Sequence, residues 1–225
     1  QGFRNYMYQV FSSNYSLSLI NQTLISHVKF SDALIALFHA KFSPKLSSSK
    51  RLSQIISITD FLNKYIKGVT SIIDDQVLRR FLSIVTACVR TNLHVKSDDQ
   101  PLSFKFQCDQ IFAMPTPIPF RETFVFDYQL EGVHIRFGEV ARGGLRWSNR
   151  LDDYRTEVFG LVKTQQTKNA VIIPVGSKGG FVIKHAPQPI AYDTGVHQYK
   201  RFITAMLQLT DNLVNEKKST PKTLI

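Results

Sequence analysis

The chain has 225 residues, of which 43% are hydrophobic and 20% are charged, and its formal net charge at pH 7 is +11. This is the composition of an ordinary globular protein that is large enough to bury a core, so a disordered chain, a collagen and a coiled coil are excluded. Because there is no run of about 18 apolar residues, the sequence predicts no transmembrane helix.

The first 95 residues are predicted to be helical. Residues 16–38 place apolar side chains at helical spacing, with a break expected around residues 29–32. Residues 43–49 contain a proline and three consecutive serines, which is typical of a linker. A second helix is predicted over residues 52–66.

A third helix is predicted from Asp74, taken as its N-cap, to about Leu93. Cys88 lies on the apolar stripe of this helix. The chain has one other cysteine, Cys108, and we expect both to be buried free thiols. Such cysteines fit a reducing compartment, and we therefore expect a cytoplasmic protein without a cysteine-based metal site.

Strands are predicted after residue 97. Residues 102–106 alternate in the manner of a strand. Residues 123–126 and 133–137 are rich in β-branched and aromatic side chains, and these two strands are predicted to connect across Glu131 and Gly132.

Helices and strands then alternate. Helices are predicted over residues 152–168 and 194–215, and short apolar strands over 170–174 and 180–184. This order indicates an α/β (α+β) fold with a mixed sheet. We expect a helical region at residues 1–97 and an incomplete α/β substrate-binding region at residues 98–225, with no Rossmann domain in this chain.

Residues 138–184 carry the candidate chemistry. Arg142 is followed by Gly143 and Gly144 after a predicted strand, Lys168 ends a predicted helix, and Lys178 lies in a glycine-rich loop expected between two strands. Glycine lets the backbone approach a ligand closely, and each cation can bind an anionic group. The pattern favours a pocket for a small dicarboxylic acid. Taken alone, each motif also has a simpler structural interpretation: a solvated arginine, a lysine at a helix C-terminus and a glycine hairpin.

Two nucleotide-binding fingerprints are excluded. Lys178 is followed by Gly179, so the segment is not a Walker loop, and it does not match the Rossmann Gly-x-Gly-x-x-Gly pattern either. The sequence therefore predicts no cofactor-binding residue and no metal ligand in this chain.

The order of these motifs resembles the glutamate dehydrogenase superfamily. Arg-Gly-Gly-Leu-Arg, a helix leading to Lys-Asn-Ala-Val, and Pro-x-Gly-Ser-Lys-Gly-Gly follow one another as in its substrate-binding segment. The longer segment from Glu131 to Arg150 is similar in sequence to the large bacterial NAD-specific enzymes. The resemblance is strongest over residues 101–184 and extends over most of the chain.

The resemblance implies a role for each candidate residue. Lys178 matches the catalytic lysine, which polarises the substrate carbonyl or activates water. Lys168 matches the lysine that binds the α-carboxylate. Arg142 stands where the small hexameric enzymes have a lysine that reaches the side-chain carboxylate, and Gly143 and Gly144 accompany it. Because an arginine differs from a lysine in reach and in donor geometry, the resemblance does not settle the contact that Arg142 makes.

The resemblance also implies oxidation of L-glutamate to 2-oxoglutarate and ammonium with NAD, in a homo-oligomeric parent enzyme. The family's catalytic aspartate and NAD domain are expected downstream of Ile225, so we expect this chain alone to be inactive.

Three alternatives remain open at this point. One is a dehydrogenase of another amino acid, although an apolar substrate would not require the charge of Arg142. Another is a basic module that binds nucleic acid or phosphate, which the net charge suggests but the scattered basic residues disfavour. The third is a noncatalytic assembly role for residues 1–95. We expect no nucleic-acid partner and no membrane association.

Overall fold

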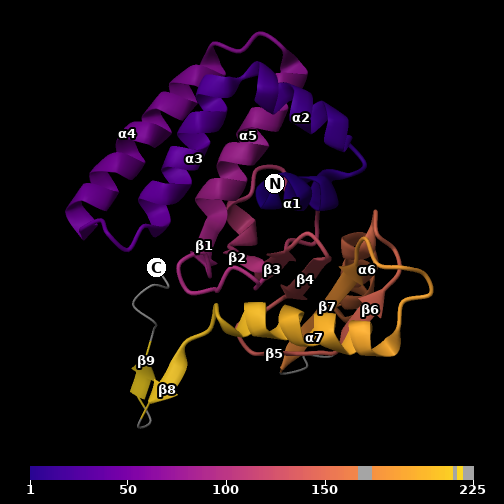
Figure 1. Cartoon of the computed structure of the whole chain (residues 1–225). Helices are drawn as coiled ribbons and strands as arrows, with labels where there is room; N and C mark the ends of the chain where they lie inside the picture. The colour runs from indigo at the N-terminus through magenta and orange to yellow at the C-terminus, as the bar shows by residue number, and fades with distance from the viewer. Residues whose placement is uncertain (167–173, 215–216, 220–225) are drawn as a thin grey trace.

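The computed structural model describes residues 1–166, 174–214 and 217–219. Helices occupy the first part of the chain, and in the view of Figure 1 they lie above a sheet formed by the second part. The helices of the first part are α1 (Gly2–Phe11), α2 (Leu17–Ser26), α3 (Val28–Phe42), α4 (Ser48–Lys67) and α5 (Ile72–Ala87).

The helical prediction is confirmed in outline and corrected at its ends. Helix α1 was not predicted, and the break predicted at residues 29–32 occurs earlier, at His27. The N-cap of α5 is Ser71, whose hydroxyl accepts a hydrogen bond from the Asp74 N–H at 3.3 Å, so Asp74 lies in the first turn. A serine hydroxyl satisfies a free N–H of the first turn, which is why the helix begins there.

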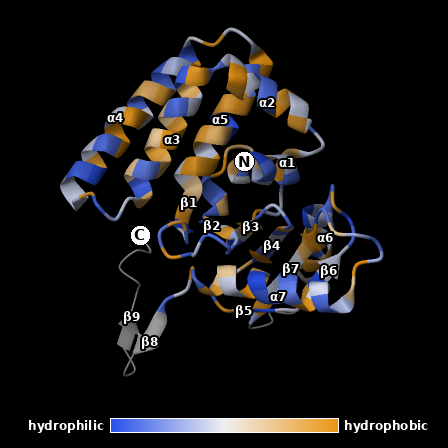
Figure 2. Cartoon of the chain, in the orientation of Figure 1, coloured by the Kyte–Doolittle hydropathy of each residue, from blue (hydrophilic) through white to orange (hydrophobic). Residues whose placement is uncertain are grey.

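The third helix was also predicted too long. α5 ends at Ala87, and the next residues form strand β1 (Cys88–Thr91), in which Cys88 pairs with Phe106. The apolar stripe continues through this point, as Figure 2 shows along α5 and β1, because the strand enters the same core. Cys88 and Cys108 are free and buried, as predicted. Burial raises the pKa of the Cys88 thiol to about 12.

The sheet is mixed, in the order β1-β2-β3-β4-β7-β5, with β6 also paired to β7. Its first five strands in this order are antiparallel, whereas β5 and β6 run parallel to β7. The strands after β1 are β2 (Leu102–Phe106), β3 (Arg121–Phe126), β4 (Leu130–Arg136), β5 (Ala141–Arg142), β6 (Leu145–Ser148) and β7 (Val175–Ile183). Helices with a mixed sheet confirm the α/β class.

The strand predictions are confirmed at some positions and wrong at others. Residues 102–106 form β2 as predicted. The turn predicted at Glu131 and Gly132 is wrong, because both residues lie inside β4 and the chain reverses just before it, where the Asp127 N–H donates to the Leu130 carbonyl at 2.7 Å. The strand predicted at 170–174 falls almost entirely on residues 167–173, outside the described residues.

The later helices are shorter than predicted. α6 spans Tyr154–Gln166, and α7 spans Tyr192–Leu207 instead of residues 194–215. A small separate hairpin follows, made of β8 (Asn212–Val214) and β9 (Lys217–Ser219). Among the described residues, no helix combines the length and apolar character needed to span a bilayer.

Each face of the sheet has its own helical cover. The larger apolar cluster joins α1, α5 and α6 to one face, which we call the α6 face. The smaller cluster joins α7 to the other face, the α7 face, through Val125, Leu130, Phe181 and Phe202. In Figure 1, α7 accordingly lies on the side of the sheet opposite α1–α5. The division of the chain at residue 97 stays a prediction.

A buried ion pair fastens α6 to the sheet. Arg155 donates from Nε and Nη2 to the two carboxylate oxygens of Glu122 on β3, at 2.7 and 2.8 Å. The side chains are 4% and 0% exposed. Although burial disfavours the charged guanidinium, the Glu122 carboxylate raises the pKa of Arg155 above its ordinary value. The backbone N–H of Arg155 also donates to the Gln9 side chain of α1 at 3.4 Å, so three elements meet here.

We expect Glu122→Gln to lower the free energy of unfolding by about 3 kcal/mol or more, because it leaves a buried guanidinium without its counterion. Urea unfolding followed by circular dichroism measures this loss. Asp75→Asn is the matched control, since it breaks the Arg79–Asp75 pair, whose side chains are 42% and 28% exposed. We expect that loss to be about 1 kcal/mol or less. Equal losses for the two variants would show that the buried Arg155–Glu122 pair stabilises the fold no more than an exposed ion pair does.

Candidate functional site

The predicted substrate-binding residues lie where β5 and β6 run beside β7. The paired residues are Ala141 with Val175, Arg142 with Gly176, Leu145 with Gly179, Arg146 with Gly180, Trp147 with Phe181 and Ser148 with Val182. Because the offset is the same in both strands, Gly143 and Gly144 lie beside Ser177 and Lys178. The Gly179 N–H donates to the Gly144 carbonyl at 3.2 Å. The structure thus brings together four of the five predicted site residues.

The glycine-rich segment around Lys178 is not the predicted loop between two strands. Residues 176–180 lie wholly inside β7. No described glycine has a positive φ, so these glycines do not serve as turn formers. Their role is close packing: a Cβ on Gly179 would lie 2.2 Å from Leu145 Cδ2, and one on Gly180 would lie 2.5 Å from Val158 Cγ2 of α6.

Gly143 and Gly144 lie between β5 and β6. They have opposite surroundings. A Cβ on Gly143 would lie 1.5 Å from the carbonyl oxygen of Ser177, which is too close for any side chain. A Cβ on Gly144 would meet no atom within 4 Å. Gly143 therefore lets two backbones touch, and Gly144 borders open space.

Arg142, Gly144 and Lys178 share one face of the sheet. Lys178 is paired with Ile135, whose side chain belongs to the core on the α6 face. Arg142 is paired with Gly176, two residues before Lys178, and side chains of a strand alternate between faces. Two cations on neighbouring strands thus flank the open space beside Gly144.

Neither cation is engaged within the described part of the chain. Lys178 is half-buried and Arg142 is exposed. No hydrogen bond or ion pair joins either side chain to another residue among 1–166, 174–214 and 217–219. Their donors are therefore available to an anionic ligand, for which an arginine offers a two-pronged contact and a lysine a point charge.

The fifth predicted residue, Lys168, lies outside the described residues. The helix before it can be placed. α6 starts near Glu131, which accepts from Tyr154 Oη at 3.4 Å, and its next turn brings Val158 against Gly180. Because Glu131 is paired with Val182, α6 runs antiparallel to β7 and its last turn points toward the Lys178 end of that strand.

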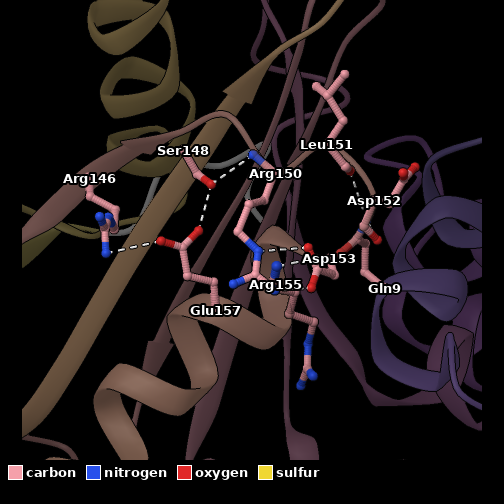
Figure 3. A network of polar contacts seen from close by, with 9 residues as sticks. All are labelled: Gln9, Arg146, Ser148, Arg150, Leu151, Asp152, Asp153, Arg155 and Glu157. Carbon is pink, nitrogen blue, oxygen red and sulfur yellow. Dashed lines mark hydrogen bonds and ion pairs between the residues drawn. The ribbon is translucent and has the colours of Figure 1, made fainter.

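Sequence reasoning missed a polar network beside this site (Figure 3). Arg146, on the same face as Lys178, forms an ion pair from Nη1 to Glu157 Oε1 at 3.0 Å. The Ser148 hydroxyl donates to the other carboxylate oxygen at 2.6 Å. The carboxylate of Glu157, 15% exposed, is held between these two groups and joins α6 to β6. Arg146 and Glu157 both belong to the motifs quoted above or lie close to them. Their contact could not be predicted, because a cation and an acid eleven positions apart in the sequence need not be neighbours in the fold.

A cavity of about 320 Å³ opens beside this network, lined by Arg146, Trp147, Ser148, Asn149 and Glu157. It neighbours the open space at Gly144 along β6, since Arg146 follows two residues later on the same face. Within the described ranges, no three His, Cys, Asp or Glu side chains gather as a metal ion would require. The groups at the site suit the binding of a carboxylate more than the ligation of a metal.

Two protein-family models match this chain, and both describe parts of glutamate dehydrogenases. The family model described as "Bacterial NAD-glutamate dehydrogenase, catalytic domain" matches residues 61–225. The model described as "Glutamate dehydrogenase, helical motif 3" matches residues 1–44. The first of these matches begins within α4 and includes α5 and the whole mixed sheet, and the second covers α1–α3.

Curated relatives align with most of this chain. The NAD-specific glutamate dehydrogenase of Halomonas elongata is 40% identical over 223 residues, which is 93% of this chain. The Mycobacterium tuberculosis protein of the same name is 42% identical and aligns with 88% of this chain. The Pseudomonas aeruginosa protein is 37% identical over 95% of it. The chain spans only 13%, 13% and 14% of the length of these relatives.

The two neighbouring glycines give a direct test of the site geometry. We expect Gly143→Ala to lower the free energy of unfolding by about 1–3 kcal/mol, because its Cβ overlaps the Ser177 backbone. Gly144→Ala should change it by about 0.5 kcal/mol or less, since its Cβ enters open space. Thermal and urea unfolding of both variants measure the difference. If both alanines are tolerated, β5 and β7 do not approach as described.

Proposed function

The chain belongs to the bacterial NAD-glutamate dehydrogenase family, whose catalytic-domain model covers residues 61–225, and we propose that it forms the substrate-binding side of the active site. The complete enzyme would convert L-glutamate, NAD and water to 2-oxoglutarate, ammonium and NADH. The observation that carries this proposal is the pair of cations, Arg142 and Lys178, which lie on either side of the open space beside Gly144 and have no partner among the described residues.

The substrate has two carboxylates and one reacting carbon. We propose that Arg142 binds the side-chain carboxylate, with Gly143 holding β5 against β7 and Gly144 leaving room for the ligand. Lys168 would bind the α-carboxylate. Lys178, half-buried in the central strand, would polarise the carbonyl of the keto acid or activate the water that hydrolyses the imine. An apolar substrate would leave Arg142 without a partner.

The described residues do not fit the cofactor. NAD-binding folds hold the diphosphate at a glycine turn between a strand and a helix. Here Gly179 and Gly180 lie inside β7, and Gly143 and Gly144 lie between two strands, β5 and β6. We assign NAD to no described residue, and we propose that the 225-residue chain is inactive without the remainder of a longer enzyme.

The helical part suggests an assembly role. We propose that the parent enzyme is a homo-oligomer and that the helical region, residues 1–97, contributes to its assembly. Large apolar side chains are exposed on α2, α3 and α4: Ile25, Ile35, Leu52, Ile56 and Phe61. A cytoplasmic location is proposed from the two free, buried cysteines, which fit a reducing compartment.

In the full-length enzyme, we expect Lys178→Ala to lower kcat by about 100-fold or more, because it removes the group that assists proton transfer and carbonyl polarisation. NAD binding, measured by fluorescence titration, should be unchanged. Lys67→Ala, on the exposed end of α4, is the control and should retain full activity. Turnover by Lys178→Ala within a few-fold of the wild type would refute the catalytic role.

Arg142→Met tests the substrate class. We expect kcat/KM for glutamate to fall about 10- to 100-fold, which corresponds to the loss of a charge-assisted contact. Norvaline lacks the side-chain carboxylate, so its kcat/KM should change little. Steady-state kinetics with both substrates measure the difference. Equal losses would place Arg142 away from that carboxylate.

A further inference from the structure

Basic side chains also gather on the opposite face of the same sheet. They form what we call the basic patch: Arg90 on β1, Lys105 on β2, Arg121 on β3, and His134 and Arg136 on β4. Arg90 is paired with Lys105, and Arg121 is paired with Arg136. Thr123 pairs with both Lys105 and His134 and so lies between them. Distant parts of the sequence therefore meet on adjacent strands.

The basic patch lies beyond the cover of α7. That helix packs on Val125, Leu130 and Phe181. The patch residues occupy the same face further along β3 and β4, because side chains two residues apart point the same way. All five are partly exposed. A ligand from solvent can thus reach them.

The arrangement places like charges directly across from each other. Cross-strand neighbours of the same sign destabilise a sheet, and here two such pairs lie side by side. A sheet that only had to fold would be more stable with opposite charges or neutral side chains at these positions. Such a local conflict is typical of a functional site.

Compensation within the described part of the chain is small. Among the ion pairs of the described residues, the one that involves the patch joins Asp211 to Arg90 at 2.9 Å. Arg136 donates from Nε to the Gly138 carbonyl at 3.0 Å and from Nη2 to the Glu139 carbonyl, and Arg121 donates to the Phe120 carbonyl at 2.7 Å, so both meet neutral partners. Lys105 makes no hydrogen bond or ion pair with a residue among 1–166, 174–214 and 217–219.

The electrostatic potential at the basic patch is consequently positive. Burial lowers the pKa of Lys105, and the nearby charges of Arg90, Arg136 and Arg121 lower it further, against the opposing effect of Asp211. His134 shows the same influence: burial, Arg136 and Lys105 lower its pKa to about 4. A bound anion would oppose the part of both pKa shifts that comes from the neighbouring positive charges.

We propose that the basic patch binds a diphosphate group, supplied either as free pyrophosphate or by a nucleoside diphosphate. One carboxylate would offset only one of the charges, whereas a diphosphate offers several charges and acceptors within a short span. Arg121 and Arg136 can each donate to phosphate oxygens from the guanidinium N–H groups that their backbone contacts do not use, and Lys105 supplies a point charge. The Thr123 hydroxyl and the neutral His134 ring add hydrogen-bonding groups.

This site differs from the proposed substrate site. Ser177 is paired with Arg136, and the next residue, Lys178, projects from the other face of β7. The two sites therefore lie on different strands of one sheet and share no side chains. Binding at one can be removed without removing the other, and the inference does not depend on the proposed enzyme activity.

Isothermal titration of the 225-residue chain with pyrophosphate tests the proposal. We expect binding that weakens about tenfold or more in Lys105→Met, through loss of one charge-assisted contact, and that recovers in Lys105→Arg. Lys178→Ala and Lys67→Met should bind like the wild type. If pyrophosphate does not bind, or if Lys105→Met and Lys67→Met bind equally, the proposal is overturned.

A second measurement locates the anion. In an NMR titration of the His134 ring, saturating pyrophosphate should raise its pKa from about 4 toward the ordinary value, because the anion cancels the charges of Arg136 and Lys105. An unchanged His134 pKa with bound pyrophosphate would place the anion elsewhere and overturn the assignment. Parallel titrations with ADP distinguish the sources: tighter binding of ADP identifies a nucleotide, and tighter binding of pyrophosphate identifies the free anion.

Discussion

The arrangement of the α6 face depends on the buried pair between Arg155 and Glu122. A guanidinium and a carboxylate removed from water are tolerable only when each satisfies the other, which leaves α6 a single position on the sheet. That position carries Val158 onto Gly180 and Glu157 toward Arg146. The same contact that holds the helix also sets the surroundings of the candidate substrate site.

The fold could be predicted where local pattern and tertiary packing agree. Residues 102–106 alternate and form β2 as expected, and the long apolar repeats form helices. Prediction was wrong where the partner decides the structure. Cys88 continues the helical stripe of α5, yet pairing with Phe106 draws it into the sheet. The turn assigned to Gly132 was wrong for a similar reason, because its missing side chain makes room for Phe202 of α7.

For the site, residue identities were easier to predict than geometry. Arg142 and Lys178 were singled out from their glycine neighbours, but the glycines around Lys178 were interpreted as a loop between two strands. They instead allow strands and helices to approach closely, which depends on atoms that are distant in the sequence. The basic patch was missed for the same reason: Arg90 and Lys105 are scattered along the chain, and only the strand pairing brings them together.

Ser177 and Lys178 are consecutive residues of β7 that serve opposite layers of the molecule. Because a strand repeats every two residues, a slip of one position against β4 would exchange its two faces. Lys178 would then turn toward the layer of α7, and Phe181 would be driven into the space beside Val158 that Gly180 now keeps free. A single inserted or deleted residue in this strand is therefore far more disruptive than most substitutions. The register of β7 against β4 thus decides which side chains of β7 lie on the α6 face and which lie on the α7 face, so the two faces cannot change independently of each other.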